Sequence, residues 1–206
     1  MNEGNEGERE RWAKRYTAPG YLFGTEPNAF LKSQAHLLRK SQTALAIADG
    51  EGRNGVFLAE QGLDVLSLDF SDVAQDKARA LAKQRGVAPR FQQADMTQWV
   101  WEPNAFDVVA GIFIQFATPP QRAVMFSGIK KTLKPGGLLL LQGYGPKQLD
   151  YKTGGPSELD RLYTRALLED SFGDFSSLDI HEHDSMLKEG DHHVGMSALV
   201  DLVGQK

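Results

Sequence analysis

The chain contains no cysteine among its 206 residues. This absence excludes a disulfide framework, a thiolate metal site and a cysteine nucleophile. Long apolar runs are missing as well, since no stretch approaches the roughly 20 residues that a transmembrane helix needs. The first residues are polar and charged where a signal peptide would be apolar. Together these features predict a cytoplasmic protein that does not interact with a membrane.

An excess of positive charge is also missing. Lys and Arg number 23 against 27 Asp and Glu, the formal net charge is -4 at pH 7, and the basic residues are scattered along the chain. This distribution argues against a nucleic-acid-binding surface. A chain of this length can bury one good core. We therefore expect an N-terminal cap segment with helices over residues 1–42, one domain over residues 43–206, a small-molecule ligand, and a monomer or weak homodimer.

The stretch from residue 45 to residue 59 is the most informative part of the chain. A short apolar run ends at Gly50 and Gly52, and a new apolar pattern with helical spacing begins at Val56. This pattern predicts a strand, a tight turn and a helix. Such a turn directs backbone N–H groups and a helix N-terminus at whatever lies above the carboxyl end of the strand. We therefore expect a ligand-binding site there.

The rest of the chain predicts an α/β fold with a doubly wound sheet of seven strands. The first five expected strands alternate with helices, which implies a parallel sheet with right-handed crossovers and helices on both faces. The last two have no helix between them and are typical of an antiparallel hairpin at one edge. The expected strands are residues 43–48, 64–69, 90–94, 106–113, 138–142, 175–184 and 194–203. Helices are also expected at 12–16, at 30–40 and at 157–169, and a turn is expected at 134–137.

The glycines of the central turn fit a known nucleotide-binding pattern. Gly50, Gly52 and Gly55 match G-x-G-x-x-G, and Asp69 follows Gly52 by 17 residues, at the end of the next expected strand. In a dinucleotide site the glycines allow the backbone to approach the ligand, and the acid accepts hydrogen bonds from the ribose hydroxyls. One alternative is a nicotinamide-dinucleotide-dependent oxidoreductase, which predicts a sheet that continues parallel. Another is that the glycines only permit tight packing between strand and helix.

Five motifs together resemble the class I S-adenosylmethionine-dependent methyltransferases, whose fold is Rossmann-like. They are IADGEGRN at 47–54, LSLDFS at 66–71, QADM at 93–96, FDVV at 106–109 and LKPGG at 133–137. Two further segments are similar to the small stand-alone methyltransferases related to the tellurite-resistance methyltransferase, namely YLFGTEPN at 21–28 and EGDHHVG at 189–195. The resemblance implies S-adenosyl-L-methionine as cofactor, S-adenosyl-L-homocysteine as product and a small-molecule methyl acceptor.

The resemblance also implies which residues bind the cofactor. Asp69 would bind the ribose, Phe70 would pack on the adenine, and Asp95 with Met96 would recognise and cover the adenine. The full set is Asp49, Gly50, Glu51, Gly52, Asp69, Phe70, Ser71, Asp95, Met96, Gly111, Ile112 and Phe113.

Two positions depart from the family pattern. The family usually has an acid at the position of Ala46 and a glycine at that of Ala48, so Asp49 or Glu51 would have to recognise the cofactor's ammonium group. A non-catalytic S-adenosylmethionine-binding module is therefore a further alternative.

Methyl transfer from a sulfonium proceeds largely through positioning, and a general base is needed only when the acceptor loses a proton. The candidate catalytic residues are His193, Tyr144 and Gln115, and a solvated turn histidine is the competing interpretation of His193. The candidate substrate and lid residues are Tyr16, Tyr21, Phe23, Gln115, Tyr144, Tyr151 and His193. The acceptor class stays open among a soft nucleophile such as tellurite or a thiol, an amine and a carboxylate. The missing thiolates argue against arsenite as acceptor.

No metal site is expected. His181, His183 and Asp184 look like a ligand cluster, but on a strand the two histidines share one face while Asp184 points to the other. We expect His181, His183 and His192 at the surface.

Overall fold

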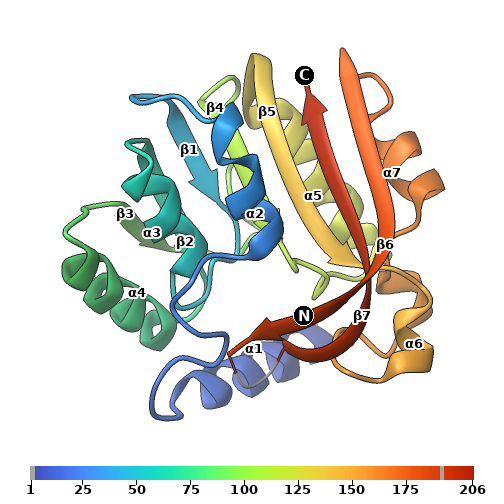
Figure 1. Ribbon diagram of the computed structural model, residues 1–206, viewed down its shortest axis with the longest axis horizontal. Coiled ribbons are helices and arrows are strands. Elements are labelled where there is room, and N and C mark those ends of the chain that lie inside the picture. Colours follow the sequence, from blue (N-terminus) through green and yellow to red (C-terminus); the bar gives the residue numbers. More distant parts are fainter. Residues whose placement is uncertain (1–2, 191–192) are drawn as a thin grey trace.

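The computed structural model describes residues 3–190 and 193–206. Its sheet has seven strands in the order β3-β2-β1-β4-β5-β7-β6, with β1 to β5 parallel, so the predicted α/β fold is confirmed (Figure 1). The strands are β1 Thr43–Ala46, β2 Asp64–Asp69, β3 Arg90–Gln93, β4 Phe106–Ile112, β5 Leu133–Tyr144, β6 Ser177–Glu189 and β7 His193–Gln205.

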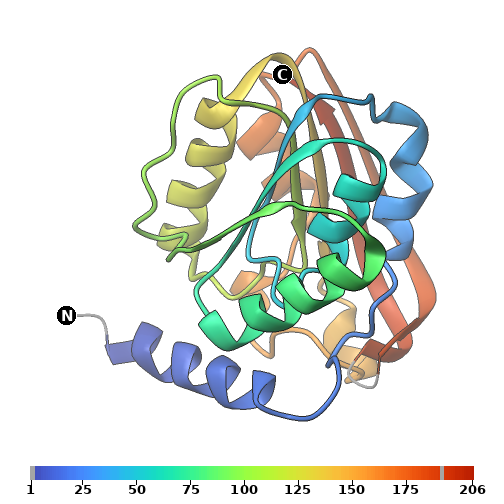
Figure 2. The ribbon, with the colours of Figure 1, turned by 90° about the vertical axis from the view of Figure 1, so that its left-hand side faces the viewer.

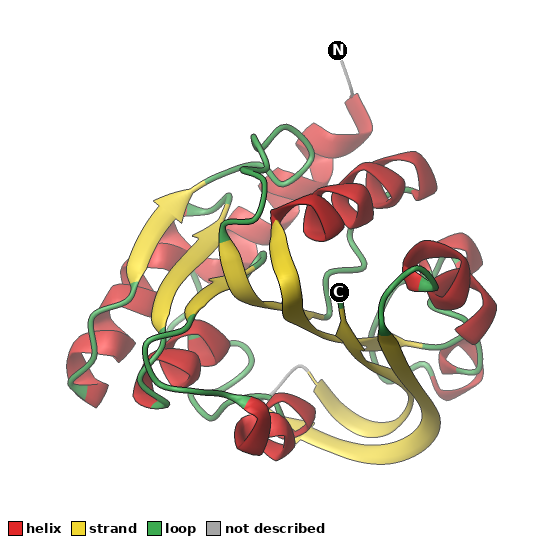
Figure 3. Ribbon diagram, turned by 90° about the horizontal axis from the view of Figure 1, so that it is seen from above, coloured by secondary structure: helices red, strands yellow, loops and turns green. Residues whose placement is uncertain are grey.

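Helices cover both faces of this sheet (Figure 3). The α-helices are α1 Glu3–Tyr16, α2 Ala29–Ser33, α3 Arg53–Glu60, α4 Asp72–Arg85, α5 Pro119–Thr132, α6 Gln148–Tyr151 and α7 Arg165–Phe172. Short 3-10 helices are η1 Gln34–Leu37 and η2 Leu159–Arg161. None of the helices in the described ranges is both long and apolar enough to cross a membrane.

The alternation of side chains along each strand builds two separate cores. In β1, Ala44 and Ala46 pack with α2 and α3 on one face, whereas Leu45 packs with α5 and α7 on the other. Leu140 in β5 joins the first core, and its two neighbours in the strand join the second. Because side chains on successive strand positions face opposite ways, a continuous apolar run is what a sheet covered on both faces requires.

The C-terminal hairpin is confirmed. Strand β7 lies between β5 and β6 and runs antiparallel to both. The hairpin is longer than predicted, and Figure 1 shows its curved end passing below the carboxyl ends of the parallel strands toward α1. A Cβ on Gly190, near the hairpin turn, would lie 2.5 Å from the Leu22 carbonyl oxygen, so this end of the hairpin packs tightly on the N-terminal segment.

Several predicted boundaries are wrong. The helix expected at 157–169 begins only at Arg165, where the Thr164 side chain accepts a hydrogen bond from the Leu167 N–H and caps it. The turn expected at 134–137 lies inside β5 as an irregularity, with Gly136 at φ +74°. The helix expected from residue 30 to residue 40 is short and ends in η1.

The N-terminal helix begins earlier than the predicted 12–16. Helix α1 starts at Glu3 and lies across the carboxyl side of the sheet, below α4 (Figure 2). Tyr16 is buried there in a cluster with Leu22 and Ala74, against which Trp12 packs. The end of α1 is therefore held in place by these tertiary contacts, because the rest of the helix contains few apolar residues.

Candidate active site

A cavity of about 390 Å³ lies where the parallel strands end and α1 crosses them. The carboxyl end of such a sheet is where α/β folds bind ligands. Residues at and after the ends of β1 to β4 contribute about half of its lining, and α1, the segment 154–161, β5 and the hairpin close it. The predicted residues that line this cavity are Tyr16, Phe23, Asp49, Gly50, Asp69, Phe70, Asp95, Met96, Ile112, Phe113, Gln115, Tyr144 and His193.

Other predicted residues do not line the cavity. The Tyr21 hydroxyl donates to the Lys77 carbonyl, and the Tyr151 hydroxyl donates to Asp184. Ser71 caps α4 by accepting from the Ala74 N–H, and a Cβ on Gly111 would meet Ile114 and Leu141. The set that lies outside the lining is Tyr21, Glu51, Gly52, Ser71, Gly111 and Tyr151.

Glu51 holds the N-terminal segment in place instead of facing the cavity. Its carboxylate accepts from the Leu22 N–H at 2.7 Å and from the Lys77 ammonium at 2.8 Å. Both oxygens are thus engaged, and the side chain is buried. Of the two acids considered for the cofactor's ammonium, only Asp49 lines the cavity.

The three glycines of the turn have different roles. A Cβ on Gly50 would lie 2.7 Å from the Tyr16 hydroxyl at the cavity wall. A Cβ on Gly52 would lie 2.5 Å from the Ala78 Cβ in α4, and one on Gly55 would lie 2.4 Å from Asp49. All three glycines therefore permit close packing, which is the structural alternative raised by the sequence, and Gly50 alone of the three also lines the cavity.

Asp69 is held at the end of β2 by two backbone donors. Its Oδ2 accepts from the Gly50 N–H at 2.8 Å and its Oδ1 accepts from the Ser71 N–H at 2.9 Å. Burial raises the pKa of Asp69 to about 6, against the lowering effect of these hydrogen bonds. Each carboxylate oxygen has a second lone pair, so the group can accept two further hydrogen bonds from a diol.

The Asp49 side chain caps the N-terminus of α3. Its carboxylate accepts from the Ser67 hydroxyl at 2.8 Å and from the Gly55 N–H at 3.1 Å. Burial raises the pKa of Asp49 to about 7, although those two hydrogen bonds lower it. A cationic ligand beside this carboxylate would stabilise its ionised form.

Ala48 lines the cavity with a strained backbone, at φ +47°. The left-handed region costs an L-residue roughly 1–2 kcal/mol. We expect Ala48→Gly to raise the free energy of unfolding by about 0.5–1 kcal/mol, because relief of strain exceeds the entropic cost of glycine, about 0.5–1 kcal/mol. Urea unfolding measures this, with Ala46→Gly in the regular part of β1 as the matched control. Equal losses of stability in both variants would contradict the expectation.

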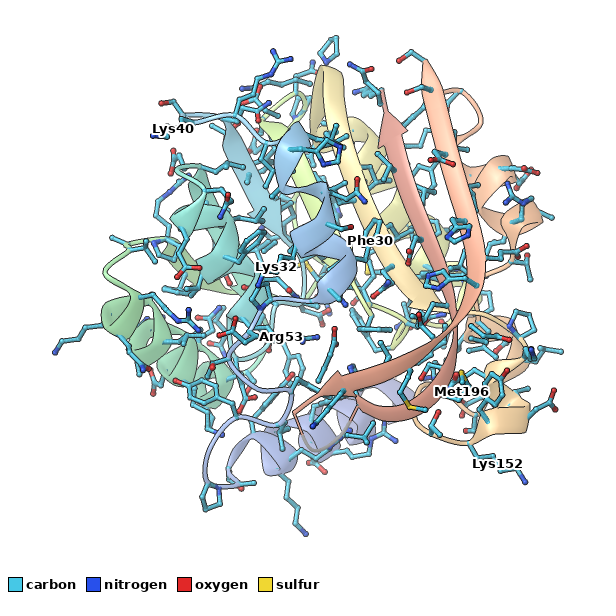
Figure 4. All side chains as sticks on the ribbon, viewed as in Figure 1. Phe30, Lys32, Lys40, Arg53, Lys152 and Met196 are labelled. Atoms are coloured by element: carbon cyan, nitrogen blue, oxygen red, sulfur yellow. The ribbon has the colours of Figure 1, made fainter. Side chains whose placement is uncertain are left out.

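A buried ion pair joins the central turn to the hairpin. Arg53, at the start of α3, donates to Glu189 at 2.7 Å, and both side chains are over 90% buried. Figure 4 shows Arg53 between α3 and the curved part of the hairpin. Burial raises the pKa of Glu189, but the hydrogen bond to His193 and the charge of Arg53 outweigh it and bring the pKa to about 2.

His193 is buried against aromatic rings rather than solvated. Its Nδ1 lies 3.4 Å from Glu189, and its ring centroid lies 4.3 Å from that of Phe23 and 4.6 Å from that of Phe113. Burial lowers the pKa of His193 below 6.5, although the hydrogen bond with Glu189 raises it. The imidazole is therefore neutral at pH 7 and able to accept a proton.

Tyr144 and Gln115 meet at the end of β5. The Gln115 amide donates to the Tyr144 carbonyl at 2.9 Å and accepts from the Tyr144 N–H at 2.6 Å. It also donates to the Arg161 carbonyl, so its polar atoms support the wall. The Tyr144 hydroxyl is buried and has no hydrogen-bond partner among the described residues, and burial raises its pKa above the usual value. A buried hydroxyl of this kind can donate a hydrogen bond to a bound molecule.

Sequence reasoning missed several cavity residues. The positively charged ones are Arg11, Arg15, Arg53 and Arg161. Nothing in the sequence around Arg11 and Arg15 indicates that these two side chains reach the cavity. Arg53 and Asn54 were quoted in the first motif without a role. The role of Arg53 could have been predicted by asking which cation pairs with Glu189, the acid of the last motif.

The sequence comparisons agree with this geometry. The family model described as "Methyltransferase domain" matches residues 44–137, which run from β1 to the start of β5. Residues 44–137 of the chain thus match a methyltransferase domain. The predicted resemblance is thereby confirmed. The matched part supplies the cavity walls that follow β1 to β4, whereas α1 and the hairpin lie outside the match.

Three known proteins illustrate the likeness. Carboxy-S-adenosyl-L-methionine synthase of Hydrogenovibrio crunogenus is 32% identical over 126 residues, 54% of this chain and 50% of that protein. TehB from Haemophilus influenzae superimposes with a TM-score of 0.73 at 15% identity, over 96% of this chain and 66% of that one. Phosphoethanolamine N-methyltransferase 2 of Haemonchus contortus, in complex with S-adenosyl-L-methionine, gives a TM-score of 0.69 at 18% identity, over 94% and 57%.

The two structural likenesses concern the fold alone at these identities. The chain spans about half, or less, of the length of the curated relatives that it matches, namely 26%, 49% and 50%.

Proposed function

We propose that this protein is an S-adenosyl-L-methionine-dependent methyltransferase that acts on a small molecule. The observation that carries the proposal is the Asp69 carboxylate, held by Gly50 and Ser71 at the rim of the cavity with lone pairs left for a ribose diol. The matched methyltransferase domain supports it. The hairpin beside β5 favours it over a nicotinamide-dependent oxidoreductase, for which the sheet should continue parallel.

The residues of the cavity fit this cofactor. Gly50 lines the cavity without a side chain, Asp49 offers a carboxylate to the ammonium group, and Asp95 with Met96 lies at the adenine position. When bound, S-adenosyl-L-methionine would supply a methyl group on a sulfonium, which would be the electrophile of the reaction. The chain's own task is to hold this group and the acceptor in line and to exclude water.

The acceptor side is formed by Phe23, Phe113, Tyr144 and His193. His193, neutral and hydrogen-bonded to Glu189, accepts the proton of an acceptor that must lose one. Tyr144 presents its hydroxyl there as a donor. The N-terminal segment 1–42, through α1, acts as the cap of the domain formed by 43–206.

Isothermal titration of the full chain with S-adenosyl-L-methionine, S-adenosyl-L-homocysteine and nicotinamide dinucleotides tests the proposal. We expect saturable binding of the first two and none of the third. Absence of heat with the first two would overturn it. Release of S-adenosyl-L-homocysteine over a panel of thiols, amines, carboxylates and tellurite then distinguishes an enzyme from a binding module and identifies the acceptor class.

Cofactor affinity is expected to depend on Asp49 and on pH. The pKa of Asp49 is about 7, so lowering the pH from 7 to 5.5 protonates it and should weaken binding about tenfold. Titrations at both pH values measure this. The Asp49→Asn variant should bind more weakly at pH 7 and lose most of the pH dependence. The same pH dependence in that variant would remove Asp49 from the ammonium site.

His193 is expected to affect turnover more than binding. His193→Asn should lower kcat about 100-fold, the usual size of a lost general base, and leave cofactor affinity within about threefold. The wild-type rate should fall only below pH 6.5, since the pKa of His193 is lowered. His36→Asn, at an exposed position in η1, is the matched control. Unchanged kcat in His193→Asn with an acceptor that loses a proton would leave the histidine a purely structural role.

Cytoplasmic location, a monomeric or weakly dimeric state and the absence of nucleic-acid partners stay predictions of the sequence.

A further inference from the structure

Three metal-ligating side chains lie together away from the cofactor cavity. They are His181 and His183 in β6 and Asp201 in β7, and one donor atom from each lies within 4.8 Å of the other two. His181 is exposed, and the other two are half-buried. Asp184, the acid next to them in the sequence, is engaged elsewhere, because its carboxylate accepts from Lys147 and from the Tyr151 hydroxyl.

The pairing of the hairpin explains why these residues meet. His181 stands directly opposite Asp201 in the antiparallel ladder, and His183 is two positions further along β6. Opposite residues, and residues two apart on one strand, project from the same face. The carboxylate that completes the cluster therefore comes from the neighbouring strand, 18 residues beyond His183 in the sequence.

The side chains of the cluster are already aligned. The imidazole rings of His181 and His183 lie parallel, with centroids 4.8 Å apart and planes at 12°. Nε2 of His183 lies 3.0 Å from Oδ2 of Asp201, and the Gln142 amide donates to Oδ1 of the same carboxylate. A hydrogen bond to the other oxygen orients a carboxylate toward a metal ion and tunes its basicity.

The surroundings suit a cation. A groove of about 330 Å³ opens beside the cluster, lined by Phe30, Ser33, Gln34, Asp179, His181, Asp201 and Val203. No lysine or arginine is among these lining residues, and the two carboxylates give the groove a negative charge. Phe30, labelled in Figure 4, marks the side of the groove formed by α2, and β6 and β7 form the other. Water can therefore reach the remaining coordination positions.

We propose that His181, His183 and Asp201 bind one divalent transition-metal ion of the Zn²⁺ class. Two imidazoles with one carboxylate are ligands that suit Zn²⁺, Co²⁺, Ni²⁺ and Cu²⁺, whereas Mg²⁺ and Ca²⁺ prefer sites made of oxygen alone. The ion ties β6 to β7 and lies on the sheet outside the lining of the cofactor cavity. Its binding therefore does not depend on the proposed methyl transfer.

Titration of the tag-free full chain with ZnCl₂ tests this proposal. We expect saturable binding of one ion per chain, and at least tenfold weaker binding in both His181→Asn and Asp201→Asn. His36→Asn and His193→Asn are the matched controls and should bind Zn²⁺ like the wild type. MgCl₂ should produce no saturable binding.

Nuclear magnetic resonance of the wild-type imidazole nitrogens provides a readout that needs no variant. Zn²⁺ should shift the resonances of His181 and His183 and leave those of His36 unchanged. No saturable binding to the folded wild type, unchanged affinity in both cluster variants, or unshifted His181 and His183 resonances would each overturn the proposal.

Discussion

Asp69→Ala is expected to weaken S-adenosyl-L-methionine binding by at least about 100-fold. The Asp69 carboxylate accepts from the Gly50 and Ser71 N–H groups and has two lone pairs left for the ribose hydroxyls. Hydrogen bonds to a charged group are worth about 1.5–3 kcal/mol each, so the loss of two corresponds to at least about 3 kcal/mol. Isothermal titration of the variant against the wild type measures the change.

The control for this variant is Asp64→Ala, at the opposite end of β2. Asp64 is exposed and forms an ion pair with Arg90, far along the strand from the cavity, so its loss should leave affinity unchanged. Thermal unfolding verifies that Asp69→Ala is folded, because the variant also leaves two backbone N–H groups without their acceptor. Near-wild-type affinity in a folded Asp69→Ala would show that the ribose binds elsewhere.

Arg53→Met is expected to lower the free energy of unfolding by about 3–5 kcal/mol. The substitution leaves the Glu189 carboxylate buried without its cation, and an uncompensated buried charge costs about that much. The Asn28 amide and His193 still contact Glu189, but neither supplies a full positive charge at neutral pH. Urea unfolding measures the loss, and Lys147→Met, which removes the exposed ion pair with Asp184, should leave the stability almost unchanged.

The double variant Arg53→Met/Glu189→Gln separates charge from packing. It should recover most of the stability lost in Arg53→Met, because no buried charge is then left over. A double variant no more stable than Arg53→Met would contradict the ion-pair explanation.

The ion pair also predicts a pH dependence. The folded pKa of Glu189, about 2, lies below the ordinary value of 4.5, so this carboxylate stabilises the fold above pH 4.5. That contribution is lost as the pH falls from 4.5 toward 2. Wild type should therefore lose more stability than Glu189→Gln over this pH range.

The two departures from the family pattern have a common structural outcome. Without an acid at Ala46, Asp49 is the carboxylate between β1 and α3 that lines the cavity, and it also caps α3. Without a glycine at Ala48, the chain still adopts the left-handed conformation and accepts the strain. Backbone strain of this kind is typical of functional sites. Asp49 and Ala48 thus both lie in the wall of the cavity.

Much of the fold and part of the site follow from local sequence. Strand and helix positions up to β5 arise from apolar periodicity and from glycines at helix ends, which act over a few residues. The carboxyl ends of parallel strands meet at one edge, so Asp49, Asp69 and Asp95 could be assigned to one cavity from their positions alone.

The sequence by itself therefore determined the α/β sheet, its final hairpin, the methyltransferase resemblance and the acids above the strands. Only the tertiary structure decided the partners of residues that are distant along the chain. Glu51 meets Lys77, Arg53 meets Glu189 136 residues away, and Asp201 joins His181 across a strand pair. Periodicity says which face a side chain takes, but such contacts depend on how helices and strands dock, and that docking is set by packing of the whole core.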